Sequence, residues 1–300
     1  MTMKQNTLLS EQETKKTVKR EKRRRVIRTM FSRKLVVVGA IGFGLFLLVA
    51  IFAPLITKYD PAVMDAKAIL AGPSSAHWLG TDNYGRDLFT RLVYGARVSI
   101  VIGVVAVSIA AAIGITLGML AAYFGGIVDV VVMRGMEALH SIPSVMFSLA
   151  MIMIIGNSML DMAVLLAITT VPTYVRMTRA MTLKVRSSDY VKAAKMAGAP
   201  SYRILLRHIL PNIMSPNIVQ MVGNVGSTIL MEAGLSFLGV GISIPTPSWG
   251  TMVSDGKAYL LTNPMMSIVP GLCVALLVIC LNLLGDGVRD AMDPRLRGEN

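Results

Sequence analysis

The sequence predicts an all-α protein that crosses a membrane several times. Of its 300 residues, 54% are hydrophobic and only 16% are charged, and the mean hydropathy is +0.62. A soluble domain usually carries about 25% charged residues. The net charge of +13 comes from clustered Lys and Arg, so that long segments have no charge at all. This clustering argues against a nucleic-acid-binding surface, and we expect the lipid bilayer, not nucleic acid, as a partner.

Six segments are apolar enough to form membrane helices, each of which needs about 20 residues. They are 35–56, 98–123, 139–156, 159–175, 213–238 and 265–284. Pro143 interrupts the third segment. The fourth is the weakest, because Asp161 and Arg176 lie near its two ends. We therefore expect six spans, or five if the fourth segment does not cross.

The distribution of basic residues predicts the orientation. Of the 30 Lys and Arg residues, 24 fall in residues 1–34, in the turn after the second span, in residues 176–208 and at the C-terminus. Cytoplasmic loops are enriched in Lys and Arg, so both termini are predicted to be cytoplasmic. The tail 1–34 is predicted to be partly disordered, and we interpret its basic run 22–25 as an orientation signal at an anionic leaflet.

The sequence carries no pattern typical of an enzyme. It has no phosphate-binding Gly-x-x-x-x-Gly-Lys-[Ser/Thr] loop, and its three histidines are scattered without metal-ligand spacing. Cys273 and Cys280 lie two helical turns apart, too far to pair with each other. We expect no directly bound cofactor or metal. Active transport would then need an ion gradient or a separate ATPase.

Few ionisable residues lie within the predicted spans. Glu137 and Asp161 are close to helix ends, whereas Glu232 lies deep in the fifth span. A charge held in the bilayer often marks a transport route, so Glu232 is a possible pathway residue, facing a cavity or the outer interface. Gly114 and Gly118 allow close helix contact, either within the chain or with a partner.

The loop 176–212 predicts a docking element. It is longer than a simple connection between helices, and its residues 190–198 have helical spacing of small and apolar side chains. A corner at 198–200 separates them from a second helical piece that ends near Pro211. Two short amphipathic helices of this kind suit a partner protein, or alternatively the membrane surface.

At this loop the chain resembles the inner-membrane permeases of binding-protein-dependent ABC importers. Their pattern is Glu-Ala-Ala, three residues and Gly, followed by a helix toward His-Ile-Leu-Pro-Asn. Here it reads Lys-Ala-Ala-Lys-Met-Ala-Gly over 192–198 and His-Ile-Leu-Pro-Asn over 208–212. The resemblance implies an ATPase-coupling loop with Asp189, Tyr190, Ala193, Ala194, Gly198, Ala199 and Pro200. Lys192 replaces the Glu of the pattern, so a salt-bridge role is not carried over to that position.

Three further motifs narrow the resemblance to the dipeptide, oligopeptide and nickel subgroup, second-permease type. They are the Leu-Gly-Thr-Asp…Gly-Arg-Asp element at 79–87, the Leu-Ser-Phe-Leu-Gly and Pro-Thr-Pro-Ser-Trp elements within 235–249, and the Asn-Leu-Leu-Gly-Asp element at 282–286. The resemblance implies outer segments 57–97 and 239–264 that meet an extracytoplasmic binding protein, or that form an outer cap on the bundle. Candidate binding-protein-facing residues are Asp82, Arg86, Asp87, Pro245, Pro247 and Trp249.

The resemblance implies an ABC type-1 permease fold and a division of the chain into four parts. These are a basic tail (1–34), a first helix with an outer loop (35–96), the transmembrane domain (97–286) and a cytoplasmic C-terminal tail (287–300). The implied partners are a sister permease, ABC ATPase subunits that bind ATP and Mg²⁺, and a binding protein. The implied location is the cytoplasmic membrane of a bacterium or archaeon.

Several functions stay open from the sequence. Di- or oligopeptides are the favoured substrates, with nickel or glutathione as alternatives within the subgroup. The poverty of ionisable residues in the spans disfavours an ion-coupled carrier, and a membrane scaffold without transport is a further alternative.

Overall fold

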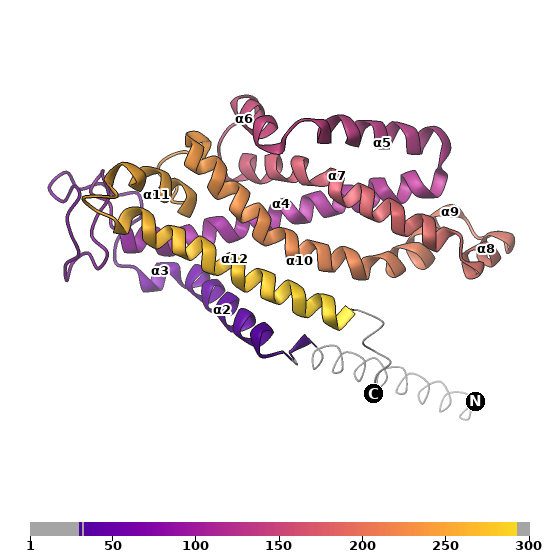
Figure 1. The fold of residues 1–300 in the computed structure, drawn as a ribbon, viewed down its shortest axis with the longest axis horizontal. Coiled ribbons are helices and arrows are strands. Elements are labelled where there is room, and N and C mark those ends of the chain that lie inside the picture. The colour runs from indigo at the N-terminus through magenta and orange to yellow at the C-terminus, as the bar shows by residue number, and fades with distance from the viewer. Residues whose placement is uncertain (1–29, 32, 293–300) are drawn as a thin grey trace, which may run out of the picture.

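The computed structural model describes residues 30, 31 and 33–292. In these residues the secondary structure is helical, apart from one isolated β-bridge between Thr81 and Asp87. Figure 1 shows α4, α7, α10 and α12 running along the long axis, with α2 on one side and α5 on the other. The helices are α2 (Lys34–Ile51), α3 (Ala53–Ile56), α4 (Leu88–Phe124), α5 (Gly126–Ser141), α6 (Ser144–Ile155), α7 (Met159–Arg186), α8 (Asp189–Met196), α9 (Ser201–Arg203), α10 (Leu210–Leu235), α11 (Trp249–Gly256) and α12 (Met265–Met292). The predicted disordered tail lies largely outside the described residues.

The central contact joins α4 and α7, and small residues make it possible. A Cβ atom added at Gly114 would collide with Cβ of Tyr174, and one added at Gly118 would lie 2.5 Å from the carbonyl oxygen of Val175. Only glycine lets the two backbones approach so closely. The Gly114 and Gly118 face therefore packs within the chain, which answers the question that the sequence left open.

Five helical segments are long and apolar enough to cross a membrane, and a bent pair supplies a sixth if it counts as one span. The bent pair is α5 and α6, which meet at 94°. Pro143 lies at the bend, and Ile142 before it has an extended backbone, as expected for a residue preceding proline. The uncertain span is thus the third, not the fourth as the sequence suggested. The fourth lies within α7, a 28-residue helix.

The helices extend beyond the predicted spans. α4 begins at Leu88 because Asp87 caps it, with its Oδ2 accepting a hydrogen bond from the backbone N–H of Thr90 (2.7 Å). α7 continues to Arg186, and α12 continues to Met292. Charged residues that we had assigned to loops therefore lie on helices.

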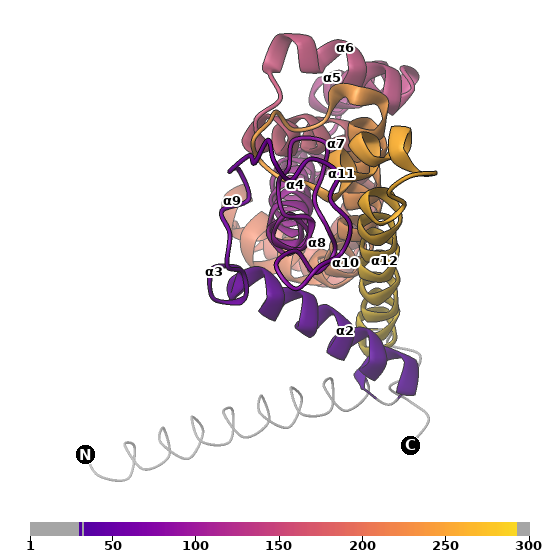
Figure 2. The same ribbon diagram turned by 90° about the vertical axis from the view of Figure 1, so that its left-hand side faces the viewer.

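The bundle has two distinct ends. The cap end, formed by residues 57–87 and 241–264, is at the left in Figure 1 and faces the viewer in Figure 2. The opposite end, here the α8 end, holds α8. Between the two ends lie the start of α2 and the end of α12. An ion pair between Arg33 Nε and Asp290 Oδ2 (3.0 Å) joins the last two.

Candidate functional site

The α8 end presents a small projecting element, residues 187–200, which we call the knob. α8 ends in a Schellman motif: the N–H of Gly198 donates to the carbonyl of Lys195 and that of Ala199 to Ala194, both at 3.1 Å. Gly198 has φ +75°, a conformation that glycine adopts without strain. Pro200 follows and prevents the helix from continuing. The Gly-Ala-Pro run therefore forms the corner that its sequence predicts.

The knob exposes most of the side chains that the sequence assigned to coupling. Val191 is buried and fixes α8 to the bundle, while Met196 is 88% exposed. Of the predicted coupling residues, Asp189, Tyr190, Ala193, Gly198 and Pro200 are exposed, and Ala194 and Ala199 are half-buried. Lys192 Nζ lies 3.3 Å from Asp189 Oδ1, so position 192 presents a cation. Contact with an ATPase stays a prediction for these residues.

The second helical piece of the predicted loop is the start of a long helix. A helical run extends from Ser201 to Val240 without ending at Pro211. Pro211 lies in the first turn of α10, where a missing N–H costs little. Ile204, Leu205 and Ile209 share a buried side. Motion of the knob would therefore act directly on α7 and α10.

A polar cavity of about 380 Å³ lies between the α5–α6 bend, α7 and α10. Six hydroxyl and amide side chains of α7 and α10 line it: Thr169, Thr170, Thr173, Asn224, Ser227 and Thr228. The bend contributes His140, Ser144 and Phe147. Among the described residues, no Asp or Glu lines this cavity. The remaining lining residues are apolar, among them Leu139, Leu166 and Met231, so the cavity suits a solute with both polar and apolar groups.

The arm formed by α5 and α6 is held by apolar packing and by one ion pair. Ile152 of α6 is buried, and partly buried side chains of α5, among them Met133 and Met136, pack against the core. α5 has no buried residue. Arg179 of α7 binds Asp129 of α5 in a bidentate ion pair, with both N–O distances 2.6 Å. The two side chains are 32% and 21% exposed. This arm borders the cavity, so whatever moves it changes the cavity.

Glu232 is buried but does not line the cavity. Its side chain accepts a hydrogen bond from Ser236 Oγ (2.8 Å), and its second oxygen, Oε2, has no partner among the described residues. Ser236 lies against Gly250 of α11, at the cap end. Glu232 thus belongs to the contact between α10 and the cap, and the suggested role in the pathway stays a prediction without support from its position.

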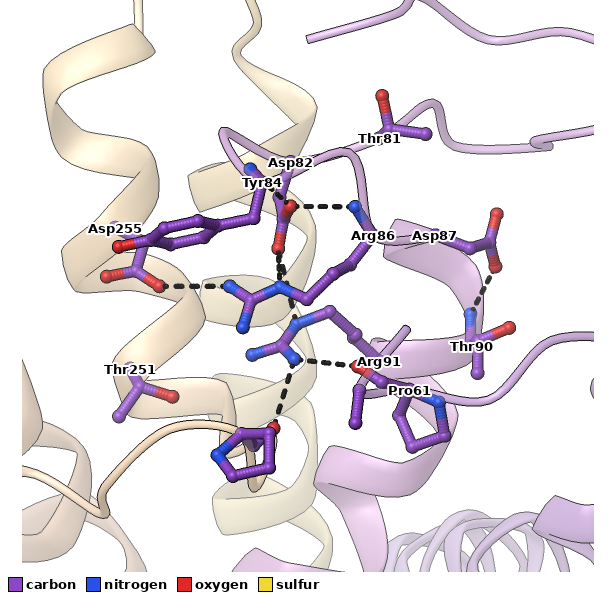
Figure 3. Close-up of polar contacts among 12 residues, drawn as sticks. Pro61, Thr81, Asp82, Tyr84, Arg86, Asp87, Thr90, Arg91, Thr251 and Asp255 are labelled. Atoms are coloured by element: carbon purple, nitrogen blue, oxygen red, sulfur yellow. Dashed lines mark hydrogen bonds and ion pairs between the residues drawn. The ribbon is translucent and has the colours of Figure 1, made fainter. Parts of the chain in front are cut away.

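The cap end is built around buried charges (Figure 3). Asp82 accepts hydrogen bonds from the backbone N–H groups of Tyr84 (2.8 Å) and Arg86 (2.9 Å), and from Arg86 Nε (2.6 Å). Arg91 Nε lies 3.5 Å from the same carboxylate. Both arginines are almost fully buried, at 0% and 2% exposure. One carboxylate thus holds two guanidiniums where water does not reach them.

This buried cluster ties the loop to the rest of the chain. Arg91 Nη1 donates to the carbonyls of Pro61 (2.9 Å) and Pro245 (3.3 Å), which come from different segments. Arg86 Nη2 lies 3.9 Å from Oδ2 of Asp255 on α11. Burial raises the pKa of the Asp255 carboxyl, and the charges of the two arginines oppose this rise. Residues 57–87, α4 and α11 are therefore fastened at one point.

The prediction that six cap residues face a binding protein needs correction. Asp82, Arg86, Asp87, Pro247 and Trp249 are buried, and only Pro245 is exposed. Trp249 packs on the Phe46 ring (centroids 5.7 Å apart), and its Nε1 donates to the carbonyl of Leu92 (2.8 Å). These side chains have their partners inside the chain, so they shape the cap, the alternative that the sequence left open. A partner would meet exposed neighbours such as Trp78 (61% exposed).

Sequence reasoning missed several partners in these clusters. Asp129 and Arg179 are 50 residues apart, and Arg91 and Pro245 are 154 apart. Asp82 and Arg86, four residues apart, are the pair that spacing alone could have suggested. The others meet only because the bundle folds.

With this geometry established, the comparisons decide the family. A model described as the binding-protein-dependent transport system inner membrane component matches residues 114–298, and the N-terminal TM domain of oligopeptide transport permease C matches residues 23–73. The chain belongs to the inner-membrane permeases of binding-protein-dependent ABC importers. This confirms the family resemblance drawn from the motifs, and it makes the chain a transport permease, not an enzyme.

Relatives cover nearly the whole chain. It is 39% identical to the dipeptide transport system permease protein DppC of Alkalihalophilus pseudofirmus, over 91% of this chain and 90% of that protein. It is 42% identical to the probable D,D-dipeptide transport system permease protein DdpC of Escherichia coli K12, over 88% and 89%. Identity with the glutathione transport system permease protein GsiD of Pectobacterium atrosepticum is 39%, over 86% and 87%.

The fold also matches a solved transporter. The chain in an inward-facing structure of the MetNI methionine ABC transporter aligns with a TM-score of 0.57 at 19% identity, over 68% of this permease and 97% of that chain. At this identity the match speaks for the fold alone, and it confirms the predicted ABC type-1 permease fold. A multi-pass permease of this kind belongs to the cytoplasmic membrane.

Proposed function

We propose that this permease forms half of the route by which an ATP-driven importer moves di- or oligopeptides across the membrane. The observation that carries the substrate class is the near full-length identity, 39% and 42%, with permeases named for dipeptide transport. The polar cavity beside α7 suits a solute rich in amide and charged groups. Glutathione, itself a peptide, is the second candidate, because a glutathione permease is equally similar. No observation here favours nickel.

The proposed partners follow from two features of the chain: it presents an exposed knob, and its sequence has no phosphate-binding loop of its own. The knob projects from the α8 end with exposed apolar side chains, and it continues into α7 and α10. We propose that ATPase subunits, which bind ATP and Mg²⁺, hold the knob, and that ATP binding moves it and switches the bundle between two orientations. A sister permease would supply the other half of the route, and a binding protein would deliver the peptide to the cap end.

The proposed orientation places the α8 end in the cytoplasm. The basic segment 176–208 includes α8, which lies at this end, and this supports the assignment. An ion-coupled carrier is less well supported, because the cavity has no carboxylate among the described residues and Glu232 lies away from it.

Purification and uptake test this proposal together. The tagged permease is purified from its native membrane in mild detergent, co-purifying proteins are identified, and the complex is reconstituted with its binding protein for uptake of labelled dialanine. We expect a sister permease and an ATPase to co-purify, and uptake to require ATP. Uptake driven by a proton gradient without ATP would overturn the proposal.

A further inference from the structure

Arg176 stands out as a cation beside the cavity without a carboxylate of its own. It lies on α7, one turn beyond the cavity-lining residues Pro172 and Thr173. Arg179, three residues further on, is neutralised by Asp129. Among the described residues, no Asp or Glu oxygen lies within 4.0 Å of the Arg176 guanidinium. Arg176 is exposed, so its guanidinium is accessible to a solute at the edge of the cavity.

The neighbour of Arg176 points to an anion as the missing partner. Arg176 Nη2 lies 3.1 Å from Nε2 of His140, a residue that lines the cavity. A guanidinium can only donate, so His140 Nε2 must accept and the ring proton must be on Nδ1. The hydrogen bond therefore orients the guanidinium without neutralising it. Most of its five N–H donors stay available.

The composition of the cavity supports the same conclusion. Its polar groups are hydroxyls, the Asn224 amide and the His140 ring, and among the described residues no carboxylate competes for Arg176. A free carboxylate fits a guanidinium through two parallel hydrogen bonds, which are among the strongest that side chains make. A positively charged group would find no partner of opposite charge in this cavity.

We propose that Arg176, oriented by His140, binds the C-terminal carboxylate of the peptide as it passes through the cavity. This inference rests on the proposed function and deepens it. It assigns Arg176 as a binding residue and His140 as a positioning residue. It also implies that the permease itself, and not only the binding protein, distinguishes free peptides from those with a blocked C-terminus.

The test compares two substrates in two proteins. Initial rates of ATP-dependent uptake are measured for dialanine and for dialanine amide, which lacks the carboxylate, in the reconstituted complex with the binding protein saturated by each. Arg176→Gln is compared with the wild type. For each protein, the rate for dialanine is divided by the rate for dialanine amide. Both proteins use the same binding protein, so the value for Arg176→Gln relative to the value for the wild type isolates the coupling between Arg176 and the carboxylate. A charge-assisted hydrogen bond predicts that this ratio falls by about tenfold.

Arg134→Gln is the matched control. Arg134 is also a guanidinium, on α5, but it is paired with Glu137 and 79% exposed, and it does not line the cavity. We expect it to leave the ratio unchanged. If Arg176→Gln does not assemble, Arg176→Lys replaces it. Lysine keeps the charge but loses the paired geometry, and an intermediate ratio is then expected.

The outcomes separate the inference from the function on which it rests. An equal loss for both peptides, or no loss for either, would overturn the binding role of Arg176 while leaving a peptide importer. Failure of the complete wild-type complex to take up either peptide would instead overturn the proposed function.

Discussion

The two ends of the bundle are stabilised in opposite ways. At the cap end, Arg86, Arg91 and Asp82 are buried, and their contacts join segments that are far apart in the sequence. At the α8 end, Val191 is the buried residue of α8, and the nearby helix α5 has none. Breaking a buried ion pair is far more costly than breaking an exposed one. The cap end is thus more strongly fastened by buried polar contacts than the arm and the knob are.

This difference fits the demands of transport. A permease must present a fixed shape to one partner and transmit motion from another, and the two tasks need different local stability.

The largest effect is expected from Arg86→Met at the cap end. The change leaves Asp82 buried with only Arg91, 3.5 Å away, as a charged partner. Loss of one member of a buried ion pair typically costs about 3–5 kcal/mol. Thermal unfolding of the purified protein measures this, and Arg134→Gln is the exposed control, for which we expect no measurable change. Equal midpoints for the two variants would contradict a locked cap.

Gly114→Ala tests the close contact between α4 and α7. Gly135→Ala, on α5 of the arm, is the matched variant at a glycine without close neighbours. The first places a methyl group against Tyr174, and overpacking of this kind costs about 1–3 kcal/mol. The second has open space around it on α5 and gains about 0.5–1 kcal/mol of helix propensity. The two free energies of unfolding should therefore move in opposite directions. A stabilising Gly114→Ala would show that α4 and α7 are less closely packed than described.

Arg179→Gln should loosen the arm while lowering the stability of the whole protein only slightly. The pair with Asp129 is partly exposed, so we expect a loss of at most about 1 kcal/mol. The effect should be local: amide hydrogen exchange should rise within 126–141 and stay unchanged in α11. A uniform rise across the bundle would show that the ion pair supports the core and not the arm alone.

Asp255→Asn should have the smallest effect. Burial raises the pKa of Asp255 in the folded protein, so folding binds protons near this pKa, and the contribution of this group to stability falls as the pH rises through that range. Near pH 7, Asn should therefore be neutral or slightly stabilising. A marked loss of stability at pH 7 would show that the ion pair with Arg86, 3.9 Å long, outweighs the burial.

Much of this architecture was predictable because membrane helices are encoded locally. Hydropathy located the spans, and the Gly198 to Pro200 run predicted the corner of the knob. The bend at Pro143 was visible, but whether the two halves form one span depends on packing. The predicted limits of α4 are too narrow because Arg91 and Arg97 suggest a loop, whereas Arg91 is buried on α4 and donates to the carbonyls of Pro61 and Pro245.

The candidate site was less accessible from sequence. The predicted docking residues follow one another along the chain, so a sequence motif can suggest them, and their contact with an ATPase stays a prediction. The cavity could not, because its lining comes from the α5–α6 bend (139–147), from α7 (166–173) and from α10 (224–231), which only the fold brings together. The cap residues were misassigned for a related reason: charged residues in a polar loop suggest a surface, and burial of Arg86 cannot be read from its neighbours.

The proposed function depends on an ATPase that holds the knob. Ala193→Arg, on the exposed face of α8, tests it most directly, with Ala66→Arg at the exposed surface of the cap end as the control. The measurement is the amount of ATPase retained on the tagged permease after purification. We predict that retention falls at least about tenfold for Ala193→Arg and is unchanged for Ala66→Arg, since a buried unpaired charge commonly costs an interface more than 2 kcal/mol. Full retention by Ala193→Arg would contradict the claim.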